Sequence, residues 1–337
     1  MKIGYWAAQE QYSMQDLLKF VVEAEKGGFT STMTSDHFHP WWHDGAYGNF
    51  TWAWIAAAAE RTRNMQFITG VTAPVYRYHP AIIAQAFASL DNLYPGRVGL
   101  GIGSGEAMNE APLGFDWPPA RARLKRTEES IRIIGKLWEQ DEGFVDFNGE
   151  YFLLRGARLY TPPTSRIPVY MAATGQQSVK VAAKLADGLI TYLSPEKARK
   201  ILGIFDETVR KSEMANKPKI AEYKVSFSAD YEEALKSTYF WRATLINKVF
   251  SSDISDPRKL QKKALKEVSD KELEKSIDII TSIEDSISSI EEYFKAGFSY
   301  VYVHSTSPNE MEFVREFSKK VIPYFRKGSE ERKVATA

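Results

Sequence analysis

The 337-residue sequence has no cysteine, almost no net charge and no long apolar run. The lack of cysteine excludes disulfides, thiolate nucleophiles and cysteine-ligated metals, and it is typical of a reducing compartment. The formal charge of +1 and the lack of a basic cluster interleaved with aromatic residues argue against a nucleic-acid partner. Residues 1–6 lack the longer apolar segment of a signal peptide, and no uncharged stretch reaches membrane-spanning length. We therefore expect a soluble, cytoplasmic protein without a nucleic-acid or membrane partner.

What the sequence does contain is a regular alternation of strand-like and helix-like segments. Eight strand segments can be counted, at residues 2–6, 30–36, 65–71, 97–103, 168–173, 188–192, 219–229 and 300–304. Strands that alternate with helices indicate a parallel sheet. Eight such units fit a closed (β/α)8 TIM barrel of the α/β class better than an open doubly wound sheet.

Two insertions interrupt this repeat. After strand 4 come a long helix at residues 121–139 and a hairpin around residues 144–154. Before strand 8, residues 251–275 are rich in Lys, Glu and Ser, which we interpret as a solvated helical face. Residues 277–282 are compatible with either a short extra strand or a loop. We expect a single barrel domain over residues 1–326, followed by a polar, flexible tail at residues 327–337.

Polar side chains gather where the first four strands end. Strand 1 leads to Glu10, and strand 2 leads into Ser35-Asp36-His37-Phe38-His39-Pro40-Trp41-Trp42. Strand 3 ends at Gly70-Val71, and strand 4 ends at Gly103-Ser104-Gly105-Glu106, with Asn109 close by. A lone loop carboxylate is usually only solvated, but ionisable groups that converge on one barrel mouth are costly unless they have a function. Because the loops after the strands form the active face of a TIM barrel, we predict the active site here.

The glycines at residues 101–105 resemble a dinucleotide-binding loop only superficially. They read G-x-G-x-G in the fourth unit, whereas that loop needs G-x-G-x-x-G after the first strand. Glycines at a strand end instead allow a planar ring to lie close to the backbone, with Glu106 at one edge of the ring. After strand 5, the backbone N–H groups of residues 174–178 lie at a helix start and are suited to an anionic group.

These motifs resemble those of the coenzyme F420-dependent dehydrogenases of the luciferase-like superfamily, and the resemblance extends over essentially the whole chain. The closest groups are the F420-dependent secondary alcohol dehydrogenases and the F420-dependent glucose-6-phosphate dehydrogenases. The most specific matching segments are Glu10-Gln11, Ser35 to Trp41, Arg77-Tyr78-His79-Pro80, Tyr94-Pro95-Gly96-Arg97-Val98 and Gly105-Glu106-Ala107-Met108-Asn109-Glu110.

The resemblance implies a role for each matching position. It implies that coenzyme F420 is bound by Asp36, Gly70, Val71, Ser104, Gly105, Asn109, Thr174, Gly175, Gln177 and Ser178, with a cis peptide between Gly70 and Val71. It implies that the catalytic residues are His37, Glu106, Trp41 and Glu10. In this scheme His37 is the base for the substrate hydroxyl and Glu106 is the acid beside the deazaflavin. The chemistry is reasonable on its own terms, because a carbinol that loses a hydride must also lose its hydroxyl proton, and histidine titrates near neutral pH.

The substrate is less well defined than the cofactor. Trp41, Tyr192, Trp241 and Lys262 are expected to line the substrate pocket. Sugar-phosphate members of the family bind phosphate with basic residues, and two of the aligned positions here are Pro195 and Ser276, although Lys197 lies close to one of them. One lysine neutralises a phosphate dianion poorly. We therefore favour a small secondary alcohol or a related hydroxyl compound, with a sugar phosphate as the alternative.

Two other kinds of enzyme remain as alternatives. His37 and His39 are spaced like a metal pair, which would suit a metal-dependent TIM-barrel hydrolase, but further ligands are scarce and we predict no metal. An FMN-dependent monooxygenase of the same superfamily would share the fold and differ in its cofactor. By resemblance to the family we also expect a homodimer.

Overall fold

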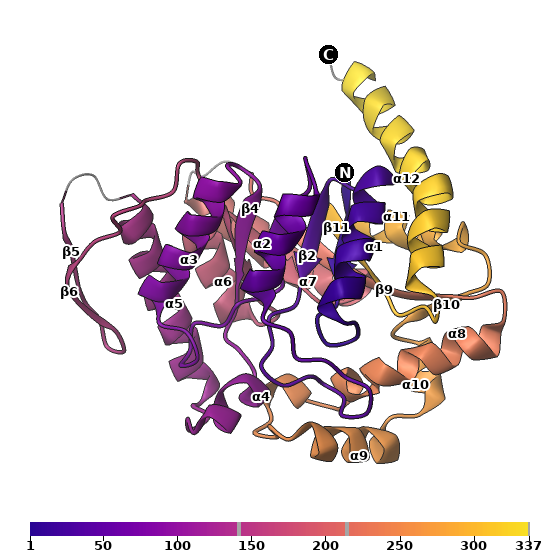
Figure 1. The fold of residues 1–337 in the computed structure, drawn as a ribbon, viewed down its shortest axis with the longest axis horizontal. Helices are drawn as coiled ribbons and strands as arrows, with labels where there is room; N and C mark the ends of the chain where they lie inside the picture. Colours follow the sequence, from indigo (N-terminus) through magenta and orange to yellow (C-terminus); the bar gives the residue numbers. More distant parts are fainter. Residues whose placement is uncertain (140–142, 213–215, 336–337) are drawn as a thin grey trace.

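The computed structural model describes residues 1–139, 143–212 and 216–335, and in this part of the chain a parallel β-barrel forms the centre (Figure 1). The main sheet has nine strands, and β8 and β9 pair to close it. All strands except β10 belong to the closed barrel: β1 (Lys2–Ala7), β2 (Ser31–Thr34), β3 (Gln66–Thr69), β4 (Val98–Ile102), β7 (Val169–Ala172), β8 (Gly188–Thr191), β9 (Lys219–Phe227) and β11 (Tyr300–Ser305). The predicted eight-stranded TIM barrel is therefore confirmed.

Helices cover the outside of the barrel. They are α1 (Met14–Lys26), α2 (Thr51–Arg61), α3 (Pro80–Leu93), α5 (Ala120–Trp138), α6 (Gln176–Leu185), α7 (Pro195–Lys211), α11 (Asp285–Lys295) and α12 (Glu310–Ala335). The predicted start of α1 is confirmed, because the Ser13 side chain accepts a hydrogen bond from the backbone N–H of Asp16 at 3.2 Å. Gly28, with a φ of +96°, follows the end of this helix and lets the chain turn towards β2.

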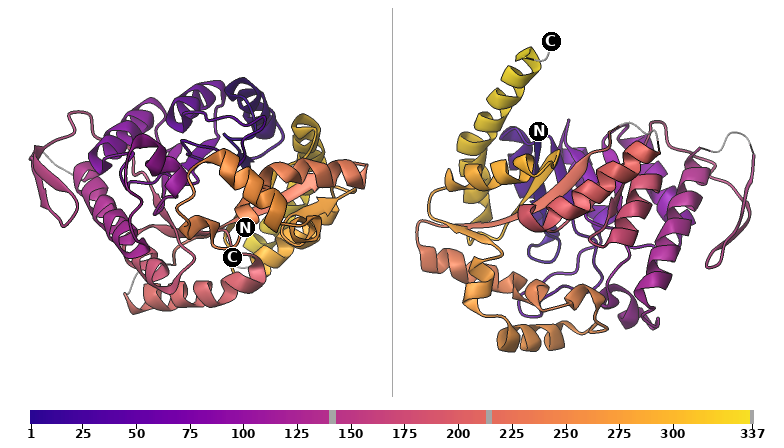
Figure 2. Two further views of the ribbon diagram at one scale, coloured as in Figure 1. Left: turned by 90° about the horizontal axis from the view of Figure 1, so that it is seen from below. Right: turned by 180° about the vertical axis from the view of Figure 1, so that it is seen from behind.

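Both predicted insertions are present. The first contains α4 (Ala107–Glu110), the short 3-10 helix η1 (Ala111–Leu113), α5 and a hairpin of β5 (Val145–Asn148) and β6 (Leu153–Ala157) that projects from the side of the barrel (Figure 1). The second lies between β9 and β11 and contains α8 (Tyr231–Ser237), η2 (Thr238–Leu245), η3 (Val249–Ser251), α9 (Pro257–Glu267), α10 (Asp270–Glu274), β10 (Asp278–Ile280) and α11. The ambiguous segment 277–282 contributes β10, an extra strand parallel to the end of β9. Figure 2 shows α9 and η2 lying across the open end of the barrel.

Successive side chains along each strand point to opposite faces of the barrel wall, so the protein has an outer and an inner apolar core. Tyr5 points outward, where its ring contacts Phe29, and this outer core joins the strands to the surrounding helices. Trp6 points the other way and belongs to an inner cluster with Met33 and Tyr302 that fills the barrel. The same inner cluster includes Trp41 and Trp241, so the packed interior continues directly into the floor of the mouth.

The chain ends in a long helix. Helix α12 begins at Glu310 and continues to Ala335, across the start at residue 327 of the predicted polar tail. The polar composition of this segment is equally compatible with a solvent-exposed helix, and the apolar residues of its first four turns anchor it to the barrel through Phe313, Phe317 and Val321. Among the described helices, none is both long and apolar enough to cross a membrane.

Candidate active site

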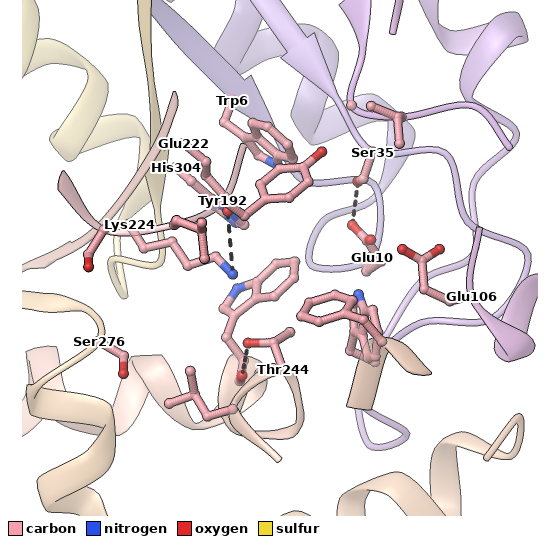
Figure 3. Close-up of a pocket in the computed structure, with 18 of the residues that line it drawn as sticks. Trp6, Glu10, Ser35, Glu106, Tyr192, Glu222, Lys224, Thr244, Ser276 and His304 are labelled. Atoms are coloured by element: carbon pink, nitrogen blue, oxygen red, sulfur yellow. Dashed lines mark hydrogen bonds and ion pairs between the residues drawn. The ribbon is translucent and has the colours of Figure 1, made fainter. Parts of the chain in front are cut away.

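A cavity of about 310 Å³ opens at the end of the barrel where the strands terminate (Figure 3). One wall comes from the first four βα units, and its residues are Glu10, Ser35, His37, Trp41, Gly70, Val71 and Glu106. The other wall comes from β8, β9, β11 and the second insertion, and includes Tyr192, Ser194, Lys197, Glu222, Lys224, Trp241, Lys275, Ser276 and His304. The structure thus brings together all four residues expected to be catalytic.

His37 and Glu10 form the polar centre of the first wall. The His37 Nδ1 atom lies 3.1 Å from Glu10 Oε1, and both side chains are largely buried, with exposed fractions of 11% and 2%. The other carboxylate oxygen of Glu10 accepts a hydrogen bond of 2.5 Å from the Ser35 hydroxyl. The ring of His37 meets Trp41 edge-on, with 5.8 Å between ring centres. The Glu10 carboxylate therefore lies in close electrostatic contact with the His37 imidazole, on the Nδ1 side of the ring.

His39 does not join His37. Its Nδ1 atom lies 3.0 Å from the backbone carbonyl oxygen of Ser255, and its ring stacks on Phe38. In the part of the chain that the structure describes, no three His, Asp or Glu side chains form a group suited to a metal ion. The pairing of His37 with His39 that suggested a metal hydrolase is therefore absent from the fold.

Asp36 lies behind the cavity rather than on its surface. It is only 1% exposed, its Oδ1 atom is 2.9 Å from an Arg77 guanidinium nitrogen, and its Oδ2 atom accepts a 2.7 Å hydrogen bond from Thr72. The carboxylate also contributes, after burial, to raising the pKa of Tyr78. In this arrangement Asp36 fixes the loop that carries His37.

Glu106 and Asn109 connect the ends of strands 2 and 4. The Asn109 side chain donates a 3.0 Å hydrogen bond to Glu106 Oε2 and accepts one of 2.8 Å from the backbone N–H of Phe38. Asn109 is itself buried, and its two hydrogen bonds fix the position of the Glu106 carboxylate relative to the loop that carries His37. Both residues lie on α4 or immediately before it, in the first insertion.

The backbone beside Glu106 approaches its neighbours too closely for side chains. A Cβ atom at Gly103 would lie 2.6 Å from Val71 Cγ2, and one at Gly101 would lie 1.8 Å from the Thr69 carbonyl oxygen. Gly70 and Val71 are joined by a cis peptide bond, as the family resemblance implied, and both line the cavity. These residues form a closely packed segment, with the Val71 side chain against Gly101 and Gly103, and Gly70 and Val71 reach the cavity.

Some residues expected at the site lie outside the cavity lining. These are Asp36, Ser104, Gly105, Asn109, Thr174, Gly175, Gln177, Ser178 and Lys262. Thr174 to Ser178 form an exposed helix start, where the Ser178 hydroxyl accepts a 3.3 Å hydrogen bond from the backbone N–H of Gly175. Lys262 is exposed on α9, and the lysines that line the cavity are Lys197, Lys224 and Lys275.

Sequence reasoning missed a charged group on the second wall. Glu222 and Lys224 of β9 lie beside His304 of β11, and the Glu222 carboxylate is 2.6 Å from His304 Nδ1. Burial raises the pKa of Glu222, but Lys224 and His304 outweigh this effect and hold it below its usual value. Burial lowers the pKa of His304. The available signal was the spacing of two between Glu222 and Lys224, which puts both on one face of a strand.

A TIM barrel with a histidine and two carboxylates at its mouth is typical of an enzyme. Comparison with known proteins identifies the family to which it belongs. Residues 1–300 match the family model described as luciferase-like monooxygenase, and the chain belongs to this family. It is 36% identical to the F420-dependent glucose-6-phosphate dehydrogenase of Rhodococcus erythropolis, over 97% of this chain and 98% of that protein.

Solved structures give the same result. An F420-dependent secondary alcohol dehydrogenase in complex with an F420–acetone adduct is 34% identical, with a TM-score of 0.91 over 95% of this chain and 98% of that one. The coenzyme F420-dependent tetrahydromethanopterin reductase of Methanopyrus kandleri shares the fold, with a TM-score of 0.78 at 20% identity over 96% of this chain and 100% of that one.

Proposed function

We propose that this protein is a coenzyme F420-dependent dehydrogenase that oxidises a hydroxyl-bearing carbon of a small molecule. Its similarity over nearly full length to F420-dependent dehydrogenases supports this function. The observation that carries it is the placement of His37, backed by the Glu10 carboxylate, in the same cavity as Glu106. Removal of a hydroxyl proton needs a base in that position.

The residues near the cavity fit a flat cofactor with an anionic tail. The close-packed segment at Gly70, Val71 and Gly103 suits the face of a planar ring, because the two glycines have no side chains of their own and Gly70 and Val71 line the cavity. We assign Ser104, Gly105 and Asn109 to the edge of the ring, with Asp36 holding the loop beside it. Thr174, Gly175, Gln177 and Ser178 lie at the N-terminus of α6, where the backbone N–H groups of the first helical turn suit the phosphate of the tail.

The side chains of the first wall supply the proton chemistry. Bound F420 accepts a hydride from the carbinol carbon. His37 accepts the hydroxyl proton, and the Glu10 carboxylate stabilises the resulting imidazolium. Trp41, which is 4% exposed, closes the pocket beside His37 and excludes water. Glu106, held by Asn109, is placed to provide a proton at the cofactor.

The substrate we propose is a small secondary alcohol or a related hydroxyl compound, in a pocket bounded by Trp41, Tyr192 and Trp241. Burial keeps the pKa of Tyr192 well above its usual value, so this wall presents a neutral phenol. A sugar phosphate is the second candidate, because Lys197 and Lys275 both line the cavity. Two ammonium groups would neutralise a phosphate dianion better than the single lysine counted from the sequence.

The function is tested by mixing the protein with oxidised F420 and a panel of alcohols and sugar phosphates. Oxidation of a substrate bleaches the visible absorbance of the deazaflavin. We expect bleaching with an alcohol, and its loss in His37→Ala. Bleaching with glucose 6-phosphate but not with isopropanol would favour the second candidate. Binding of FMN instead of F420 would refute the proposal in favour of a monooxygenase.

We further propose that residues 1–326 form one domain and that the protein is a homodimer in the cytoplasm. The lack of cysteine and the family resemblance support these assignments. Size-exclusion chromatography with light scattering tests the oligomeric state directly.

A further inference from the structure

The far wall of the cavity carries a charged group that the proposed chemistry does not use. Figure 3 shows Glu222, Lys224 and His304 on the opposite side of the cavity from Glu10 and Glu106. All three side chains are at least four-fifths buried, with exposed fractions of 10%, 18% and 1%. Charged groups with so little water need a function or a complete set of partners.

The group is rigidly held on three sides. His304 Nδ1 lies 2.6 Å from one oxygen of Glu222, and the His304 ring stacks on Trp6 with 5.3 Å between ring centres. Trp241 meets the same imidazole edge-on at 4.4 Å, and the Lys224 ammonium lies 4.9 Å from the centre of the Trp241 ring. The position of the ammonium is therefore fixed by aromatic packing as well as by charge.

The gap between Lys224 and Glu222 is too long for a direct hydrogen bond. Lys224 Nζ lies 3.8 Å from Glu222 Oε2, whereas N–H···O bonds span about 2.7–3.2 Å. Separations of this size between polar groups are commonly bridged by an oxygen atom that bonds to both. An ammonium only donates and a carboxylate only accepts, so the bridging atom must accept from one and donate to the other.

We propose that Lys224 and Glu222 form a specificity-determining pair that binds a second hydroxyl group of the substrate, so the enzyme favours diols and polyols over simple alcohols. This inference rests on the proposed function, since it concerns the same cavity. A hydroxyl is the common substrate group that both accepts and donates. An anionic atom is disfavoured between the two groups, because there it would lie beside the carboxylate of Glu222 as well as the ammonium of Lys224.

The substrate test uses cyclohexanol and its 1,2-, 1,3- and 1,4-diols, which differ only in a second hydroxyl at three spacings. We expect kcat/KM for F420 reduction to be about tenfold or more higher for one diol than for cyclohexanol. Lys224→Met and Glu222→Gln should each lower kcat/KM for that diol about tenfold more than kcat/KM for cyclohexanol, so that the preference is lost. Lys266→Met, which alters an exposed lysine of α9, is the matched control and should leave both unchanged.

A binding measurement separates failure of this inference from failure of the proposed function. Trp6 and Trp241 adjoin the pair, so diol binding to the cofactor-free protein can be followed by tryptophan fluorescence. Diol affinity that falls about tenfold in Lys224→Met and in Glu222→Gln, but not in Lys266→Met, supports the pair even if F420 is not reduced. Equal binding of cyclohexanol and every diol, or equal losses for both in the variants, overturns it.

Discussion

Replacing Glu10 with Gln isolates the charge that stands behind His37. The carboxylate oxygen lies 3.1 Å from His37 Nδ1, and the side chain is only 2% exposed. Two unit charges at that distance attract by about 5 kcal/mol at an effective dielectric constant of about 20. This attraction arises only after the imidazole has taken the substrate proton, so it acts on the transition state more than on the bound substrate.

The amide of Gln keeps the shape but removes the charge, and an opposite charge this close is typically worth about 1.5–3 kcal/mol to a neighbouring ion. Since about 1.4 kcal/mol corresponds to a tenfold change in rate, kcat for F420 reduction should fall by about 10- to 150-fold with little change in KM. The assay is deazaflavin bleaching at saturating substrate, together with F420 binding by fluorescence. The control is Glu310→Gln, which replaces a buried carboxyl outside the cavity. A loss of kcat below about threefold in Glu10→Gln would refute this reasoning.

The control variant Glu310→Gln also tests a prediction on stability. Burial raises the pKa of Glu310 to about 8, above its usual 4.5. Between these two pH values the folded protein keeps a proton on Glu310 that the unfolded chain has released. Wild-type stability should therefore fall as the pH rises from about 4.5 to about 8, and in thermal unfolding Glu310→Gln should gain on the wild type over that interval and level off above it. Asp36→Asn leaves the guanidinium of Arg77, 7% exposed, without its charged partner, and urea denaturation should show a loss of about 3–5 kcal/mol. Gly101→Ala drives a methyl group to 1.8 Å from a backbone oxygen and should prevent soluble expression, whereas Gly203→Ala, in α7 with open space around it, should raise the free energy of unfolding by up to about 1 kcal/mol.

The barrel could be predicted because its signals are local and repeated. Strands such as β4 have the apolar run of a buried parallel strand, and α1 has clear limits at Ser13 and Gly28. The short segment around β10 stayed ambiguous, because three residues that pair with the end of a neighbouring strand carry little pattern of their own. The continuation of α12 beyond residue 326 was not predicted, because the polar sequence there has no apolar periodicity to indicate a helix.

The candidate site was predictable on one wall only. His37, Trp41 and Glu106 follow directly after strands, so the barrel alone brings them to the mouth. The second wall depends on how an irregular insertion folds back, and this is why Lys275 rather than Lys262 reaches the cavity. Glu222 and Lys224 lie within a strand, where charged residues are usually interpreted as facing outward until the closed barrel shows which face is inside.

The insertion between β9 and β11 supplies part of the second wall from one continuous segment of the chain, apart from the segments that form the first wall. Trp241, Thr244, Phe250, Lys275 and Ser276 all come from this continuous stretch, which contributes no strand to the closed barrel. The proposed base, its carboxylate and the proposed cofactor-binding residues all come from the first 178 residues. Exchanging residues 228–299 with the matching stretch of a relative would therefore transplant part of the substrate wall as a cassette, with the machinery for proton and hydride transfer left in place.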